Sequence, residues 1–313
     1  MASFDLVNYS LRPSKAIQRA LVFEDIRRLM LLLGLKDLVY VGFGSVWFVD
    51  FQIAHRLLKA SDLVSIELDD VGFVRAQFNA PFSSVVVKHG HSNVVLPPLY
   101  LDDQYKNRPW VMWLDYDFEW DESVCEDVRL AIERLPQNSM LITTFNAMGN
   151  KYGQPKNRGQ RLAALLGGLV NPNRDKAEYD GDSLSPILRK GVLDYMGSIA
   201  GECSRPGGFV PGFSLGYRDQ ASMATVGGIL PAPESRSSVQ ELVSSNDWRS
   251  LQEEILVAPH LTAKEATLLQ NELPKRHIDR QVVQRLGFDL LDHQIAAFQK
   301  YYLYYPSFAQ IVT

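Results

Sequence analysis

The stretch "DLVYVGFGSVWFVDF", residues 37–51, decides the fold that we expect for this protein. Its apolar, β-rich run "LVYVGF" is typical of a central strand in a parallel sheet that is covered on both faces. Gly42 and Gly44 then predict a tight turn, in which the backbone can approach a ligand without obstruction by side chains. A helix is expected from about Ser45 to Ala60. The stretch therefore predicts the strand, glycine turn and helix of a nucleotide- or nucleoside-binding fold.

Further strands alternate with helices after this stretch. Four are expected, within residues 63–70, 83–90, 109–117 and 139–146, and a helix is expected over residues 121–135. Residues 209–230 read as two strands that are joined at "RDQA", which predicts a hairpin. Alternation at this spacing predicts right-handed βαβ units. The expected fold is α/β, with a doubly wound, mostly parallel Rossmann-like sheet that an antiparallel hairpin closes.

Helical segments are expected on both sides of this sheet domain. The first helix should begin with Ser14 as its N-cap and end at Gly34, and apolar residues recur between them at near-helical spacing. After the Pro/Ser-rich break "PAPESRSS" the chain reads as all helix. The predicted regions are an N-terminal helical segment covering the pocket (1–36), a Rossmann-like domain (37–231) and a C-terminal helical region (238–313).

Composition limits the classes of protein to consider. The formal net charge of −4 argues against a protein whose main task is non-specific nucleic-acid binding. Cys125 and Cys203 are the only cysteines, too few for a disulfide scaffold, and they favour free thiols in a reducing compartment. The N-terminus lacks an apolar signal core, and Lys36 and Asp37 interrupt the most apolar region, so no membrane span is expected. We expect a cytoplasmic protein.

Glu67 indicates which kind of ligand the glycine turn would bind. It ends the second strand, about 20 residues after the turn, where an acidic side chain accepts hydrogen bonds from ribose hydroxyls. Dinucleotide sites also need a third small residue for close approach to the pyrophosphate, and Trp47 and Phe48 stand there instead. S-adenosylmethionine has a ribose but no phosphates, so it fits this sequence better than a dinucleotide does.

The motifs "YVGFGS", "SIELD", "KHGHSNVVLPPL", "VMWLDYD" and "MLITTFN" follow one another in an order that resembles class I S-adenosylmethionine-dependent methyltransferases. The pattern is closest to small-molecule O-methyltransferases of the catechol type, and it covers about residues 37–230. The resemblance implies S-adenosyl-L-methionine as the cofactor. It also implies these positions: Gly42, Gly44 and Ser45 at the methionine end, Glu67 at the ribose, Gly90, His91 and Ser92 beside the adenine, and Asp115 at the reaction cleft.

One departure from that pattern concerns a metal. The resemblance implies an Asp-Asn pair at the end of the fifth strand in metal-dependent members, whereas this chain has Phe145-Asn146. Phenylalanine cannot ligate Mg²⁺, which demands oxygen ligands in near-octahedral geometry. We therefore expect no metal, although Asp115, Asp117 and Asn146 could still form a poor site.

Candidate catalytic residues are the polar side chains expected at the carboxyl edge of the sheet. Methyl transfer needs an acceptor in line with the sulfonium methyl group, and often a base. His89 or His91 could be that base, or both could only flank adenine or lie at the surface. Asp115 is the foremost candidate for a functional side chain, together with His91 and Asn146, and Asp117 should share its face of the strand and contact substrate.

A basic loop follows the fifth strand. Its sequence "NKYGQPKNRGQR" contains no acid and is expected either to form a lid over an anionic acceptor or to be a solvated loop. The lid would use four residues of the loop and two that precede the first strand, which are Lys151, Lys156, Arg158 and Arg161, with Arg12 and Lys15.

Three functions remain open from the sequence. The first is methyl transfer to an anionic or hydroxylated acceptor, a small molecule or a nucleotide, without a metal. The alternative is a non-catalytic methyltransferase-like scaffold that binds a nucleoside ligand, or a protein partner through its C-terminal helices. The aromatic segment "FQKYYLYYPSF" could form such a partner-binding face, or a packed core. The third is another reaction on a nucleoside ligand.

Overall fold

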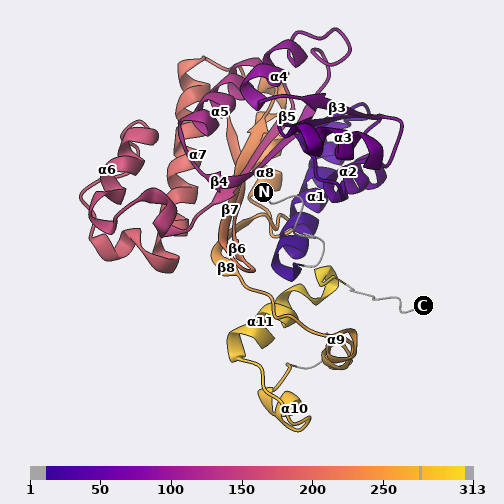
Figure 1. The fold of residues 1–313 in the computed structure, drawn as a ribbon, viewed down its shortest axis with the longest axis vertical. Helices are drawn as coiled ribbons and strands as arrows, with labels where there is room; N and C mark the ends of the chain where they lie inside the picture. Colours follow the sequence, from indigo (N-terminus) through magenta and orange to yellow (C-terminus); the bar gives the residue numbers. More distant parts are fainter. Residues whose placement is uncertain (1–11, 275–276, 307–313) are drawn as a thin grey trace.

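The fold is built on one mixed sheet. The computed structural model describes residues 12–274 and 277–306, and its eight strands lie in the order β3-β2-β1-β4-β5-β7-β6-β8 (Figure 1). Strands β1 to β5 pair in parallel, and β7 pairs antiparallel with both β5 and β6. The predicted parallel sheet with a late antiparallel hairpin is therefore confirmed. The bounds are β1 Val39–Phe43, β2 Asp62–Glu67, β3 Val85–His89, β4 Trp110–Glu119, β5 Ser139–Asn146, β6 Val210–Arg218, β7 Ser222–Leu230 and β8 Leu251–Leu256.

Helices cover both faces of the sheet. One hydrophobic core contains α1 (Pro13–Leu33), α2 (Val49–Ile53) with its π-helical continuation Ala54–Leu58, α3 (Asp70–Asn79) and α8 (Arg236–Val243). A second core contains α4 (Ser92–Leu99), α5 (Glu122–Arg134), α6 (Pro155–Leu165) and α7 (Leu184–Glu202). Short 3₁₀ turns lie at Gly149–Tyr152, Lys176–Tyr179, Gly181–Ser183, Pro233–Ser235 and Tyr302–Tyr304. The fold is doubly wound, as expected.

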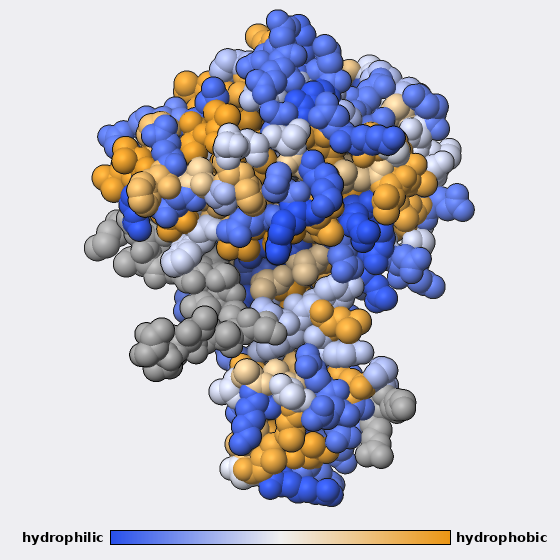
Figure 2. Space-filling view, turned by 90° about the vertical axis from the view of Figure 1, so that its right-hand side faces the viewer, coloured by the Kyte–Doolittle hydropathy of each residue, from blue (hydrophilic) through white to orange (hydrophobic). Residues whose placement is uncertain are grey.

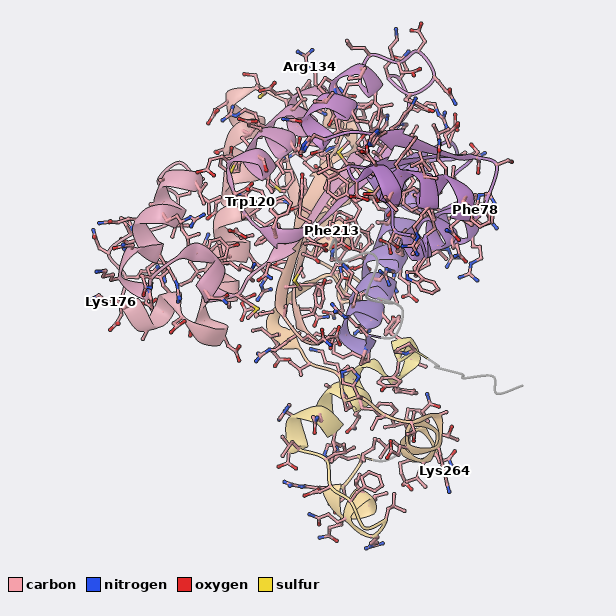
Figure 3. The ribbon with its side chains drawn as sticks, viewed as in Figure 1. Phe78, Trp120, Arg134, Lys176, Phe213 and Lys264 are labelled. Carbon is pink, nitrogen blue, oxygen red and sulfur yellow. The ribbon has the colours of Figure 1, made fainter. Side chains whose placement is uncertain are left out.

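Large aromatic side chains fill both cores. Phe213 of β6 packs against Trp248 on the α1 side of the sheet, and the two ring centroids are 5.6 Å apart. Trp120, just after β4, belongs to the other core and contacts Tyr195 of α7 (Figure 3). Phe213 and Trp120 are fully buried. Burial of this size on both faces explains why the central strands read as continuous apolar runs.

The ends of α1 differ in how well the sequence predicts them. Its C-terminus is as expected, because Gly34 adopts the left-handed conformation with φ 63°. Its start is not: Arg12 is the N-cap and Pro13 is the first helical residue, so Ser14 lies inside the helix. The N-terminal N–H groups of Ser14 and Lys15 instead donate to the carboxylate of Asp219, at 2.9 and 3.0 Å. A distant turn therefore caps this helix.

Two further boundaries differ from the prediction. The helix after the glycine turn begins at Val49 rather than Ser45, because Phe48 has a positive φ of 47°. The segment after residue 238 is not all helix, because β8 pairs in parallel with β6. Arg189 donates hydrogen bonds to the carbonyl groups of Gln252 and Glu253 in β8, which holds this polar edge strand in place. Pairing with β6 overrides the helix preference of "LQEEIL".

The remaining helices form a small lobe below the sheet. They are α9 (Ala263–Gln270), α10 (Arg280–Gln284) and α11 (Asp292–Tyr301), and Figure 2 shows the lobe below a narrower neck. The aromatic segment is a packed core here, since Phe298 and Tyr305 are buried and in contact. The last residues of this aromatic segment, beyond residue 306, lie outside the described residues. Among residues 12–274 and 277–306, no helix combines the length and apolar character that a bilayer crossing needs.

Candidate functional site

A cavity of about 810 Å³ opens at the carboxyl ends of the parallel strands. Its wall takes residues from the turns after β1, β2 and β3, from the ends of β4 and β5, from α1 and from the β6–β7 hairpin. Ligands of open α/β sheets bind at this edge, and pockets of roughly 300–1,000 Å³ hold drug-sized ligands. The cavity is therefore the candidate functional site.

The glycine turn after β1 forms one wall. Gly44 and Ser45 line the cavity, together with Trp47, whereas Gly42 lies within β1. A Cβ atom on Gly44 would overlap the hydroxyl of Ser65, and on Gly42 it would lie 2.9 Å from the carbonyl oxygen of Trp113. Gly42 thus serves close packing between β1 and β4, and Gly44 serves close packing of the turn against Ser65 of β2.

Glu67 lies in the cavity wall at the end of β2. It is 9% exposed. Its Oε1 accepts hydrogen bonds from the backbone N–H groups of Leu68, at 3.0 Å, and Asp69, at 3.4 Å. Burial raises the pKa of this carboxyl above its ordinary value, although these N–H groups oppose the shift. Both bonds use Oε1, so Oε2 can accept hydrogen bonds from a ligand.

The turn from β3 into α4 forms the next part of the wall. Gly90, with φ 137°, donates its N–H to the carbonyl of Glu67 at 3.0 Å, which ties the two turns together. His91 and Ser92 both line the cavity. Ser92 donates to Asp127 of α5 at 2.5 Å, and this contact fixes the start of α4. His89 is not a lining residue: its ring stacks on Phe73 of α3.

Asp115 forms a buried ion pair at the end of β4. Its Oδ2 lies 2.5 Å from the ammonium nitrogen of Lys15 in α1, and both residues line the cavity. Burial lowers the pKa of Lys15, but Asp115 and then Tyr217 outweigh this effect and raise it above the ordinary value. Lys15 therefore stays charged. Tyr116, the next residue, is buried in the other hydrophobic core, where its hydroxyl donates to Asp127 at 2.8 Å.

A second ion pair lies one helical turn further along α1. Arg19 pairs with Asp50 of α2. All four residues of the two ion pairs line the cavity. Lys15 and Arg19 are 4% and 5% exposed, on a helix whose other buried residues are mostly apolar. The spacing i, i+4 places both cations on one face of α1.

The end of β5 brings Asn146 into the cavity and keeps Phe145 out of it. Phe145 is fully buried against Trp120, with ring centroids 5.3 Å apart. Asn146 is a lining residue whose side-chain oxygen accepts the N–H of Met148 at 2.9 Å. Asp117 also lines the cavity, near the surface. In the described part of the chain, no three His, Cys, Asp or Glu side chains gather into a group that could hold a metal ion.

The basic loop is not part of this site. Lys151, Lys156, Arg158 and Arg161 are not among the described residues that line the cavity, and α6 lies on the side of the sheet away from α2 and α3 (Figure 1). Arg158 is 5% exposed and donates to Asp180 at 2.7 Å and to the carbonyl of Tyr179 at 2.9 Å. It is a structural residue. That these loop cations receive an anionic acceptor stays a prediction; of the six cations of the expected lid, Arg12 and Lys15 line the cavity.

Sequence reasoning missed several lining residues. Arg19, Asp50, Tyr217 and Asp219 come from elements that meet only in the folded protein. A signal for Arg19 was present: with Lys15 it places two cations at helical spacing on a face that apolar residues otherwise occupy. The hairpin residues carry no comparable local signal, because only the antiparallel pairing brings the "RDQA" turn to the cavity.

Similar solved structures include two from methyltransferases. One is Trm1 from Pyrococcus horikoshii in complex with S-adenosyl-L-methionine, at 13% identity and a TM-score of 0.47, over 72% of this chain and 58% of that one. The other is an O-methyltransferase from Bacillus cereus in complex with SAH, at 12% identity and a TM-score of 0.38, over 66% and 80%. The match thus spans less than two thirds of the length of Trm1.

Family membership rests on the sequence. No curated protein matches it. A family model described as "Putative O-methyltransferase" matches residues 7–313, which includes the glycine turn, both ion pairs of the cavity and the C-terminal lobe. The chain therefore belongs to this O-methyltransferase family.

Proposed function

We propose that this protein transfers a methyl group from S-adenosylmethionine to a hydroxyl group of a small acceptor. The observation that carries the proposal is the buried carboxylate of Glu67 in the cavity wall, next to the glycine turn at Gly44. Burial raises the pKa of this carboxyl group because its charged form is poorly solvated. Hydroxyl donors from a ligand would stabilise the charged form. The two hydroxyls of a ribose are donors of this kind.

The residues of the cavity fit the parts of this cofactor. The turn at Gly44 and Ser45, which lines the cavity, would receive the methionine end. Glu67 would hold the ribose, and Gly90, His91 and Ser92 would lie beside the adenine. When bound, the cofactor supplies an activated methyl group on a positively charged sulfur. Asp115 and Asn146, at the ends of β4 and β5, would lie on the acceptor side of the cavity.

The charges of the wall support a neutral acceptor. Among the described lining residues, carboxylates outnumber lysines and arginines by eight to three. Such a wall attracts a sulfonium cation and disfavours a multiply charged anion such as a nucleotide. A hydroxylated small molecule is therefore a better acceptor than a nucleotide. The acids are Asp50, Glu67, Asp69, Asp70, Asp115, Asp117, Asp127 and Asp219, and the bases are Arg12, Lys15 and Arg19.

We also propose that the reaction needs no metal. Asp115, the first expected ligand, is paired with the ammonium of Lys15, and the side-chain oxygen of Asn146 accepts a backbone N–H group. A divalent cation would have to displace Lys15, and position 145 offers it no oxygen ligand, because Phe145 is buried away from the cavity. EDTA should leave methyl transfer intact, and loss of activity that Mg²⁺ restores would contradict this part of the proposal.

We also propose a cellular location and a protein partner. A cytoplasmic location agrees with the two free cysteines. A protein partner for the C-terminal helices is supported by exposed leucines in that lobe, Leu286, Leu291 and Leu303.

The test of the proposed function is cofactor binding. Isothermal titration calorimetry with S-adenosylhomocysteine should give one site per chain, and Glu67→Gln should weaken binding by about 1.5–3 kcal/mol, the cost of losing hydrogen bonds to a charged group. Glu241→Gln is the matched control, because Glu241 is exposed on α8 and does not line the cavity. Equal affinities of wild type and Glu67→Gln would remove the ribose assignment, and absence of binding to wild type would reject the function.

A further inference from the structure

We propose that Lys15 is a catalytic residue, whose ammonium group binds the acceptor oxygen and stabilises it as an anion during methyl transfer. This inference rests on the proposed function, because it concerns the acceptor side of the same cavity. It goes beyond that function by assigning a residue of the N-terminal helix, outside the Rossmann-like domain, to the chemical step.

The position of Lys15 supports this role. It lines the cavity from α1 and is 4% exposed, so its long side chain is held in one place. The ammonium nitrogen lies 2.5 Å from Oδ2 of Asp115 and 5.5 Å from the centre of the Tyr217 ring. These contacts fix the ammonium at the carboxyl end of β4, between the sheet and the hairpin.

The chemistry of a buried ammonium suits an oxygen ligand. It carries three N–H donors; the bond to Asp115 uses one and the contact with the Tyr217 hydroxyl a second, which leaves one for a ligand. Burial weakens the competition from water, so a further bond to a developing oxyanion is stronger than at the surface. Asp115 and Tyr217 raise the pKa of Lys15, which keeps it a donor and excludes it as the base.

The pair is not needed to anchor the start of α1. The N–H groups of Ser14 and Lys15 already bond to Asp219, and the hydroxyl of Ser14 bonds to the carbonyl of Arg218 at 2.8 Å. Arg19 binds Asp50 one turn later. A lysine that served only to attach the helix would repeat what these contacts do. Its side chain is directed to the cavity instead.

The step that follows is a balanced methyl transfer. The acceptor hydroxyl gives its proton to bulk water as it binds, and the resulting oxyanion is held by the ammonium of Lys15. An oxygen lone pair then attacks the methyl carbon, and the carbon–sulfur bond breaks with its electron pair going to sulfur. The products are the methyl ether and S-adenosylhomocysteine, and Lys15 keeps its proton throughout.

The experiment uses the full chain saturated with S-adenosylhomocysteine and titrated with 4-nitrophenol, whose visible absorbance reports its ionisation. Wild type should bind the probe as phenolate, at a pH where the free probe is still largely neutral. Lys15→Met should bind it at least tenfold more weakly, without the shift in ionisation. Lys15→Arg should retain both properties. Lys156→Met is the matched control, an exposed lysine outside the cavity, and should behave as wild type.

The outcomes separate this inference from the proposed function. If S-adenosylhomocysteine does not bind wild type, the proposed function fails. If it binds, but the phenol does not bind or binds without a shift in ionisation, the role of Lys15 fails. The role also fails if Lys15→Met matches wild type. Should Lys15→Met not fold, Lys15→Gln decides, because it keeps a donor and a similar length but removes the charge.

Discussion

The backbone N–H of Ser250 donates a hydrogen bond of 2.8 Å to Oδ2 of Asp25, across 225 residues of sequence. Asp25 lies in α1 and Ser250 immediately precedes β8, and both are fully buried. The N–H of Arg249 reaches the same oxygen, also at 2.8 Å, and Arg28 binds Oδ1. One carboxylate thus attaches the last strand of the sheet to the helix whose other end lines the cavity.

Replacing Asp25 with alanine should lower the free energy of unfolding by roughly 2–4 kcal/mol, because backbone N–H groups lose a charged acceptor in the protein interior. Urea unfolding measures this change. The control is Asp247→Ala, which removes an exposed carboxylate from the same segment and should change stability by less than about 0.5 kcal/mol. Equal effects of the two substitutions would show that the contact to Ser250 is not important for stability.

Gly44→Ala should destabilise the protein by about 1–3 kcal/mol, because its Cβ would overlap the hydroxyl of Ser65. That hydroxyl is buried and has no hydrogen-bond partner among the described residues, so Ser65→Ala alone should cost little. The double variant should recover most of the loss, which a double-mutant cycle in urea detects. Gly197→Ala is a control of opposite sign: its Cβ meets nothing within 4 Å in α7, and it should stabilise by about 0.5–1 kcal/mol. Additive effects at Gly44 and Ser65 would contradict the proposed overlap.

Ionised Glu67 should lower the stability of the ligand-free protein, although it is the group proposed to bind the ribose. Its native pKa is raised by burial, so the native protein holds this proton more tightly than the unfolded chain does. Ionisation of Glu67 therefore destabilises the ligand-free protein as pH rises through the native pKa, and this cost is absent well below the unfolded value. Without ligand, Glu67→Gln should be more stable than wild type at neutral pH, and the difference should shrink as pH falls into the acid range. Urea unfolding at a series of pH values tests this, and a difference that does not change with pH would contradict it.

Arg158→Ala should destabilise the protein without affecting cofactor binding. The guanidinium group binds Asp180 and the carbonyl groups of Gly153 and Tyr179, so its removal should cost about 1–3 kcal/mol. Lys156→Ala, an exposed neighbour on the same helix, should change stability by less than about 0.5 kcal/mol. Affinity for S-adenosylhomocysteine should equal that of wild type in both variants, by calorimetry. If Lys156→Ala weakened binding of S-adenosylhomocysteine without lowering stability, the loop would belong to the binding site after all.

The sequence by itself determined the elements whose signals are local. The apolar run of β1, the glycine turn, the position of Glu67 at the end of β2 and the hairpin around "RDQA" are each specified by consecutive residues. Alternation of strands and helices then restricts the topology, because parallel strands need right-handed crossovers that cover both faces. These features sufficed to predict the fold and the edge of the sheet where the cavity lies.

Only the tertiary structure decided which side chains act together. Lys15 meets Asp115 across 100 residues, and Asp219 caps α1 across 204 or more. The sequence around Arg158 predicts a lid or a solvated loop, yet Arg158 is buried and its guanidinium group donates to Asp180. "LQEEIL" favours a helix by its residues, but it becomes β8 because β6 and Arg189 offer partners for its backbone. Local preferences are worth tenths of a kcal/mol per residue, whereas a buried polar contact is worth more, so distant partners settle these positions.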